Sequence, residues 1–493
     1  MKLRCIIPFS LLAAITLLPG CNDFLKLTPD SEYSVAGAYK TENDFIQAIV
    51  GVYAQQQNLY ASNSTWFRAL SVRSDETRNN APYSEGMSRF IDDATNPLLL
   101  GAWNNFYRVI ALSNEVIGRI DNGSFTNETS RSNIKGEAFA LRAWAYWNLG
   151  WQFGGVPLID RVLTVEETKQ VKRSSQEETF TFAERDLKEA ISLLPEKWTG
   201  ANSGRITRYA AKSLLARLYM FRKNFSAAKP ELESVMQSGF YAMEADYRGC
   251  FADSKDNGPE RVWEIQFTGG QMGEGQAFST GLLPEGFNDK SIMPFSGYST
   301  AMEVSQPMYD AYEPGDKRRD LSILKGWKNA QGQSDTVSKF IVKYLHYDAY
   351  TPQTQNDWAI NLPVVRYTDV VMMYAEALNE TGYEANGEAL KILNQVRARA
   401  GLTALKVADV PDQDAFRKAL MKERRVEFAF EGLRWTDLIR WGLAKETMNA
   451  FFMRPEEGNG LYAMRDHQVL FPIPFEELSR YNDLSVLWQN EGY

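Results

Sequence analysis

The sequence predicts a mainly α-helical protein, in which paired helices form a scaffold and a loop-rich region with a few short strands interrupts it. Three observations lead to this prediction. Apolar residues recur with helical spacing through the first half of the chain and its C-terminal third. Two of these segments form helix pairs of about 34 residues, the length of a tetratricopeptide repeat. Residues 239–361 lack this spacing and are rich in glycine and aromatic residues.

The clearest helix is predicted at 367–380, where the apolar residues share one face. A second helix follows the turn at 382–387 and stops at Gly401, because a glycine there favours the left-handed conformation that ends helices. Residues 208–238 repeat the construction, with a tight turn at 223–225. Further helices are expected at 41–58, 101–120, 131–150, 176–194, 412–430 and 434–449.

The loop-rich region lies at about 239–361. It contains short strand-like pieces at 262–267 and 340–344. Between Thr268 and Thr300 there are seven glycines and no regular spacing of apolar residues. So long an irregular stretch in a compact protein is usually functional, so we expect the ligand-binding region here.

The N-terminus has the pattern of a lipoprotein signal peptide. Lys2 and Arg4 precede a broken apolar run over 6–18, which is too short to span a membrane. A small residue, Gly20, then precedes Cys21. We therefore expect residues 1–20 to be removed and Cys21 to be lipidated, which anchors the protein in a membrane without a spanning helix.

Composition excludes several classes of function. Removal of residues 1–20 leaves 52 basic and 62 acidic residues, a net charge of −10, so nucleic acid is not an expected partner. Only Cys250 then remains beside Cys21, which leaves no pair for an intramolecular disulfide. With two histidines in the chain, zinc clusters and serine–histidine catalysis are not expected. We expect no metal site and no cofactor.

Several motifs along the chain have the pattern of one known protein family. The C-terminal half carries MMYAEALNETG at 372–382, LNQVRARAGL at 393–402, KERRVEFAFEGLRWTDLIRWG at 422–442 and FPIPFEEL at 471–478. Upstream are ALRAWAYWNLGWQFGGVPL at 140–158 and the start at Cys21. Together these motifs resemble the SusD/RagB family of glycan-uptake lipoproteins, and the resemblance extends over the whole mature chain.

This resemblance implies a fold, a location and a partner. The fold would be SusD-like, a single domain over 21–493 with four tetratricopeptide-like hairpins. The protein would be lipid-anchored at the outer membrane, face outward and bind oligo- or polysaccharides. It would cap a SusC-like TonB-dependent transporter and deliver glycans to it. It would not be an enzyme.

Two motifs suggest other chemistry. The charged block at 423–437 has the residue types of a catalytic carboxylate cluster, but opposite charges three or four residues apart on one helix form ion pairs, which we take as the better interpretation. Residues 269–275 are glycine-rich like a phosphate-binding loop, but no Lys-Ser/Thr pair and no helix pattern follow. We interpret this segment as a flexible loop.

Aromatic residues provide the candidate ligand contacts. Those at helical spacing are predicted to be core: Trp103, Phe106, Tyr107, Trp144, Tyr146, Trp147, Trp151, Trp435 and Trp441. Five others lie among glycine, proline, serine and asparagine, where a flat ring suits a sugar face: Trp66, Tyr83, Tyr298, Trp327 and Trp358. We expect Asp75, Arg78 and Asn79 to supply polar contacts, although Asp75 could instead cap local backbone.

Three alternative functions stay open at this point. A RagB-like relative that captures peptides would have the same motifs. A tetratricopeptide scaffold that binds only proteins would leave the loop aromatic residues unexplained. A glycosidase needs two carboxylates on opposite sides of the scissile bond, and no motif nominates such a pair.

Overall fold

The computed structural model describes residues 39–61, 66–78, 84–297, 302–329 and 331–493. The predicted signal peptide and Cys21 lie outside these ranges. Within them, no helix combines the length and the apolar character that crossing a membrane requires.

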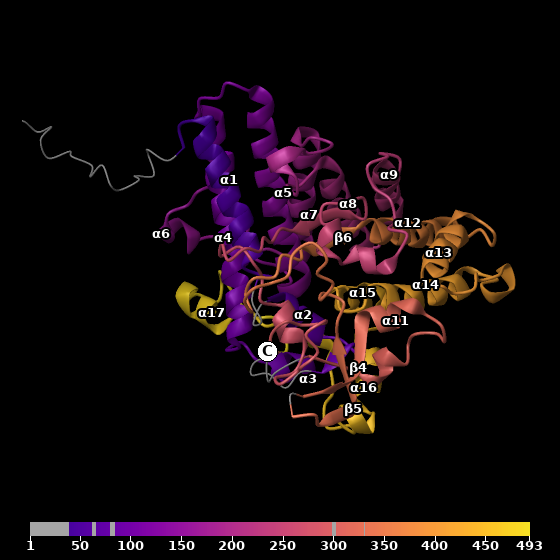
Figure 1. The fold of residues 1–493 in the computed structure, drawn as a ribbon. Coiled ribbons are helices and arrows are strands. Elements are labelled where there is room, and N and C mark those ends of the chain that lie inside the picture. Colours follow the sequence, from indigo (N-terminus) through magenta and orange to yellow (C-terminus); the bar gives the residue numbers. More distant parts are fainter. Residues whose placement is uncertain (1–38, 62–65, 79–83, 298–301, 330) are drawn as a thin grey trace, which may run out of the picture.

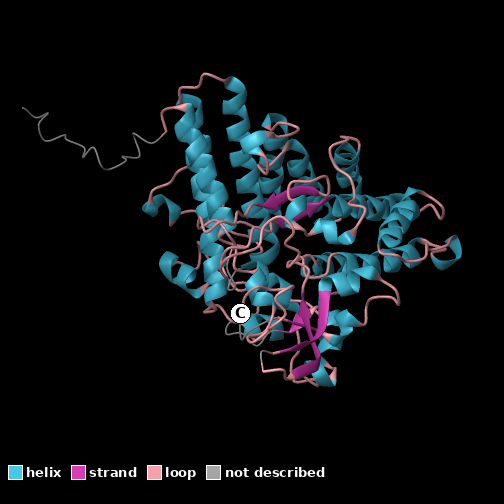
Figure 2. Cartoon of the chain, in the orientation of Figure 1, coloured by secondary structure: helices cyan, strands magenta, loops and turns pink. Residues whose placement is uncertain are grey.

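Helices dominate the structure, which confirms the predicted fold class (Figure 2). The first group comprises α1 (Glu42–Gln57), α2 (Trp66–Val72), α3 (Ser84–Arg89), α4 (Pro97–Arg119), α5 (Glu128–Phe153), α6 (Val165–Thr168), α7 (Gln176–Leu193), α8 (Arg208–Phe221) and α9 (Phe225–Met236). In Figure 1, α1, α4, α5, α7 and α8 stand side by side, and consecutive long helices pack against each other. This is the arrangement expected of stacked helical hairpins.

Local capping signals explain where these helices begin. Thr41 and Ser175 form capping boxes at α1 and α7, in which the side chain and the third helical residue satisfy each other's backbone N–H groups. Asn127 caps α5, and Gly154, with φ of 80°, ends it. The predicted hairpin at 208–238 is present as α8 and α9.

The second group of helices comprises α10 (Gln306–Tyr309), α11 (Lys317–Ser322), α12 (Tyr367–Gly382), α13 (Glu388–Arg399), α14 (Gln413–Glu427), α15 (Arg434–Trp441), α16 (Ala444–Phe452) and α17 (Phe475–Tyr481). The predicted pair at 367–401 is present as α12 and α13. The prediction of one helix at 434–449 is wrong. Gly442 adopts a left-handed conformation with φ of 75°, which ends α15 and turns the chain into α16.

In the part of the chain that the structure describes, six short strands form two antiparallel sheets. They are β1 (Thr77–Arg78), β2 (Arg261–Ile265), β3 (Glu303–Val304), β4 (Ile323–Lys328), β5 (Ser334–Ile341) and β6 (Leu362–Arg366). The order β1-β3-β5-β4 makes one sheet, and β2 pairs with β6 in the other. The strand predicted at 340–344 is displaced toward the N-terminus, because β5 begins at Ser334 and ends at Ile341. Figure 2 shows the two sheets in separate parts of the molecule.

The buried apolar residues form separate cores, and these cores divide the molecule into a helical scaffold and a loop-rich layer. One core runs through α1, α4, α5, α7, α8 and α9, and a smaller one joins α12, α13 and α14. Another lies beneath the β1-β3-β5-β4 sheet and includes Val304, Phe340 and Trp358. The helical scaffold therefore carries the loop-rich region as a layer with its own core.

Candidate functional site

The candidate site lies where β1 pairs with β3. Arg78 is the last residue of β1, and it pairs with Glu303, the first residue of β3. Asn79 follows Arg78 directly in the chain, and the segment 298–301 precedes β3 by one residue. The pairing therefore joins the attachment points of two segments that sequence analysis connected with ligand binding.

A pocket of about 280 Å³ opens beside Arg78. Its walls come from β1, α3, β3, the end of α16 and the segment after it, and they include Arg78, Arg89, Glu303, Phe452, Glu457 and Tyr462. The guanidinium of Arg89 lies 4.9 Å from the centre of the Tyr462 ring. Charged donors, carboxylate acceptors and an aromatic ring thus share one opening, which is the combination that sugar hydroxyl groups and sugar faces require.

Arg78 is held in this pocket without being enclosed. Its Nη1 donates to the carbonyl of Glu456 at 3.0 Å, and its Nε lies 3.4 Å from a carboxylate oxygen of Glu457. Glu303 is more distant, at 3.9 Å, and the Arg78 side chain remains 35% exposed. The guanidinium is therefore oriented by the protein and still faces solvent.

Glu457 is buried at the back of the same pocket. Burial raises its pKa to about 7, and the Arg78 guanidinium and the backbone N–H of Gln306 oppose this rise. Glu457 ends the short 3₁₀ helix η7 (Pro455–Glu457), and Gly458 follows it with φ of 136°. A Cβ on Gly458 would lie 2.9 Å from the Tyr462 ring, so glycine is required at this turn.

Two residues predicted to contact ligand are buried instead. Asp75 accepts a hydrogen bond from Arg434 at 2.8 Å and lies 2.7 Å from Arg425, so its carboxylate joins β1 to the C-terminal scaffold. Trp358 is completely buried and donates from Nε1 to Thr280 Oγ1 at 2.7 Å. The expectation of an exposed ring at Trp358 is wrong, because long-range contacts cover it.

Of the remaining predicted residues, Arg78 and Trp327 lie on the two edge strands of the sheet. Trp327 is half-buried on β4, where its ring lies 6.3 Å from that of Phe287. It occupies the opposite edge strand from Arg78, roughly 15–20 Å away by strand spacing. Trp66 begins α2, and its side chain is not described; Asn79, Tyr83 and Tyr298 lie outside the described residues. An extended ligand is needed to reach both Arg78 and Trp327.

Glu303, Glu457 and Tyr462 are pocket residues that sequence analysis missed. Glu456-Glu457-Gly458 has the composition of an exposed turn, and two adjacent glutamates give no sign that one is buried. The left-handed glycine positions at 458 and 460 are the available signal, since they indicate a tightly built turn.

The charged block is an ion-pair network, as interpreted from the sequence, but its partners come mainly from other elements. Glu427 pairs with Arg318, Arg366 and Arg399, and Glu431 pairs with Lys343 and Arg366. The predicted spacing on one helix is seen for Asp437, which pairs with Arg440 just beyond the block. Its carboxylates therefore connect α11, α13, β6 and α14 within the scaffold.

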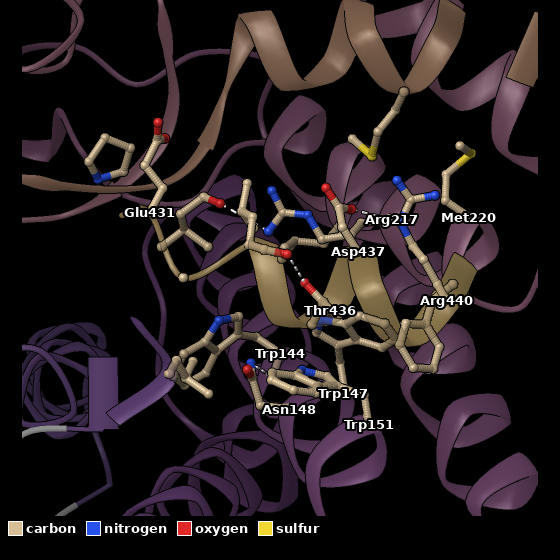
Figure 3. A pocket seen from close by; sticks show the side chains of 18 of the residues that line it. Trp144, Trp147, Asn148, Trp151, Arg217, Met220, Glu431, Thr436, Asp437 and Arg440 are labelled. Carbon is tan, nitrogen blue, oxygen red and sulfur yellow. Dashed lines mark hydrogen bonds and ion pairs between the residues drawn. The ribbon is translucent and has the colours of Figure 1, made fainter. Parts of the chain in front are cut away.

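An internal cavity of about 80 Å³ lies between α5, α8 and α15 (Figure 3). Trp144, Trp147 and Trp151 line one side, and Asp437 and Arg440 line another. The predicted core aromatic residues are buried, except that Tyr107 and Trp441 are partly exposed. This cavity has room for a few water molecules and belongs to the scaffold.

A larger groove of about 990 Å³ runs between α4, α6 and α17. Leu112, Ile159 and Val165 are among the residues that line it. None of the described residues that sequence analysis assigned to ligand lies on this groove. The pocket at Arg78 is the opening that contains one of them.

The fold and the pocket define a helical-repeat protein with a polar, ligand-sized opening in its loop-rich layer. The model of the SusD family matches residues 326–493, and a second family model, described as starch-binding associating with outer membrane, matches residues 23–220. The chain belongs to the SusD family. This confirms the resemblance that its motifs indicated.

Relatives match over nearly the whole chain. SusD-like protein P2 of Formosa agariphila is 26% identical over an alignment of 512 positions, which covers 97% of each chain. Surface glycan-binding protein A from Bacteroides fluxus has a TM-score of 0.79 at 25% identity and covers 92% of this chain and 100% of that one. A laminarin binding SusD-like protein has a TM-score of 0.76 at 26% identity, with coverage of 92% and 100%.

Proposed function

We propose that this protein is a surface lipoprotein of the outer membrane, anchored through Cys21, that binds glycans at the Arg78 pocket. It delivers them to a SusC-like TonB-dependent transporter. The observation that carries the proposal is the β1–β3 pair, which places Arg78 and Glu303 beside a polar pocket and at the attachment points of the segments containing Asn79, Tyr83 and Tyr298.

The pocket chemistry supports a sugar ligand. Arg78 is oriented by the Glu456 carbonyl and keeps a solvent-facing guanidinium that can donate to sugar oxygens. Glu303 and Glu457 accept from hydroxyl groups, and Tyr462 offers a ring. The names of two structural relatives, a surface glycan-binding protein and a laminarin binding protein, support the same ligand class.

We further propose that the chain binds glycans without cleaving them. Glu423, Glu427 and Glu431 are each paired with arginine or lysine in the scaffold. Such pairing engages each carboxylate in the scaffold and does not leave it free to act as an acid or a nucleophile. Release of reducing ends from a bound polysaccharide would contradict this part of the proposal.

The test is a binding panel on the mature chain without its lipid. Laminarin, starch and polygalacturonate are compared with an oligopeptide digest by calorimetry and affinity electrophoresis. We expect a dissociation constant between about 1 μM and 1 mM for a neutral glycan, because an open site on a delivery protein must release its ligand. Binding of peptides alone would favour the RagB-like alternative, and binding of neither class would favour a protein-interaction scaffold.

A paired variant locates the site. Arg78→Ala is expected to weaken glycan binding at least tenfold, and Arg185→Ala serves as the control because Arg185 is 54% exposed on α7, outside the pocket. If both variants lost glycan affinity equally, or if neither variant lost affinity, the glycan would bind elsewhere.

A further inference from the structure

We propose that Glu457 is a ligand-binding residue of this site and that it makes the site selective for neutral or amino-bearing glycans over acidic ones. The inference rests on the proposed function. It adds Glu457 as a ligand-binding residue and names neutral or amino-bearing glycans as the ligand class.

The first argument is the state of the Glu457 carboxylate. Its side chain is 1% exposed, and neither oxygen has a hydrogen-bond partner among the residues that the structure describes. By contrast, the buried Glu431 accepts from Lys343 and Arg366 at 2.7 and 2.8 Å. A buried carboxylate whose ion pair with Arg78 spans 3.4 Å, without a well-aligned hydrogen bond, is only weakly compensated, so a role in folding alone does not explain it.

The surrounding groups leave Glu457 incompletely neutralised. Arg78 lies 3.4 Å away, and its Nη1 is already bonded to the Glu456 carbonyl. The backbone N–H of Gln306 and the guanidinium of Arg454 also face the carboxylate, and the Glu456 carboxylate adds a like charge. The capacity of Glu457 to accept hydrogen bonds is therefore only partly used in the free protein. Hydroxyl or amino groups of a ligand in the pocket are the donors that fit it.

The second argument is the charge of the pocket. Three carboxylates line it, from Glu303, Glu456 and Glu457, against the two guanidiniums of Arg78 and Arg89. Arg89 is in addition paired with Glu85, so part of its charge is already compensated. A uronic acid or a sulfated sugar would bring another negative charge next to Glu457, which is unfavourable at short range in a partly desolvated site.

The third argument is that the backbone holds Glu457 in place. The N–H groups of Asn459 and Gly460 donate to the carbonyls of Arg454 and Phe452 at 2.9 and 2.8 Å, which closes the turn on both sides of Glu457. Gly458 packs so closely against Tyr462 that a side chain there would clash. A rigid segment thus holds the carboxylate in the wall of the pocket, as a binding group requires.

The experiment compares Glu457→Gln with Glu446→Gln. Both substitutions remove one negative charge, but Glu446 is exposed on α16 and does not line the pocket. Calorimetry with laminarin and starch is expected to show at least tenfold weaker binding for Glu457→Gln and less than threefold for Glu446→Gln. The ligand-free melting temperature of Glu457→Gln should equal or exceed that of the wild type, because an unpaired buried charge is removed.

Several results would overturn the inference. A lower ligand-free melting temperature for Glu457→Gln would show that the carboxylate is a structural partner. If the wild type binds laminarin or starch and Glu457→Gln binds it with the same affinity, Glu457 does not contact the ligand. The proposed function would then remain intact. Tighter wild-type binding of polygalacturonate than of either neutral glycan would overturn the ligand class. A wild type that binds no glycan would overturn the proposed function and this inference together.

Discussion

Nε of Arg434 donates to one carboxylate oxygen of Asp75 at 2.8 Å, while Nη2 of Arg425 lies 2.7 Å from the other. Asp75 and Arg434 are 359 residues apart in the sequence. The pair therefore joins the turn before β1 to α15, and through it the candidate site to the scaffold.

Asp75→Asn is expected to destabilise the protein rather than to abolish ligand contact directly. The substitution leaves two largely buried guanidiniums without their common counter-charge, which costs about 3–5 kcal/mol. Urea unfolding measures the loss. Asp121→Asn is the control, because Asp121 pairs with Lys135 at an exposed position, and a change within about 1 kcal/mol is expected there. If Asp75→Asn kept the stability of the wild type but lost glycan binding, Asp75 would be a ligand contact, as predicted from the sequence.

Two tryptophans predicted together from the sequence should respond differently to the same substitution. Trp358→Ala removes a fully buried ring and its hydrogen bond to Thr280, so the free energy of unfolding should fall by about 3–5 kcal/mol. Trp327→Ala removes a half-buried ring on an edge strand. It should cost less stability but weaken glycan binding by about 1–3 kcal/mol.

Thermal unfolding and calorimetry on both variants separate these effects. The assignment of Trp327 fails if Trp327→Ala binds laminarin, starch and polygalacturonate as the wild type does. The assignment of Trp358 to the core fails if its removal leaves the melting temperature unchanged.

Glu76 should make stability depend on pH in a defined direction. Burial, followed by the nearby Asp75 charge, raises the pKa of Glu76 to about 8. A raised carboxyl pKa contributes stability that is present below the unfolded value of about 4.5 and is lost as the pH rises through the folded value. Between pH 5 and pH 8.5, Glu76→Gln should therefore gain on the order of 2–4 kcal/mol relative to the wild type.

Melting temperatures of Glu76→Gln across this pH range test the prediction. Glu476→Gln, at the exposed start of α17, is the matched control and should follow the wild-type curve. Parallel curves for Glu76→Gln and the wild type would mean that Glu76 does not titrate in this range.

The helical scaffold could be predicted from sequence because its signals are local. The spacing of apolar residues, the capping residue Ser175 and the glycine after α13 all act within one or two turns of a helix. The break at Gly442 was missed because apolar spacing continues across it, and only the left-handed backbone shows the division.

The site was harder to predict because it depends on contacts between distant segments. Trp358 lies in a polar, aperiodic stretch, and its burial comes from Gln276 and Thr280. Arg78 was identified from its neighbours in the chain, but its pocket is completed by residues 451–462, which carry no motif. Burial of Glu457 likewise follows from the packing of that turn against β1.

Cys21 is expected to be the sole anchor of the protein in the membrane. Cys21→Ala should move it from the outer-membrane fraction to a soluble one, because a lipidated N-terminal cysteine supplies the apolar chains that hold it there. Cell fractionation and immunoblotting measure the shift, and Cys250→Ala is the control since Cys250 is a buried thiol. If Cys21→Ala stays in the outer membrane to the same extent, a protein partner holds it.

The transporter partnership gives the last prediction. A protein that delivers glycans must hold its transporter through surfaces other than the ligand pocket, since the pocket has to stay open to solvent. Affinity purification from detergent extracts of native membranes should therefore recover a SusC-like TonB-dependent protein together with this chain. Arg78→Ala and Glu457→Gln should recover the same amount of transporter as the wild type, because both residues lie in the pocket. Asp75→Asn should recover less, in proportion to its lost folded fraction.

Recovery of the wild-type chain alone, under conditions in which a known pair from the same family stays together, would contradict the proposed delivery role. Loss of the transporter in Arg78→Ala with an unchanged melting temperature would instead make the pocket itself part of the interface.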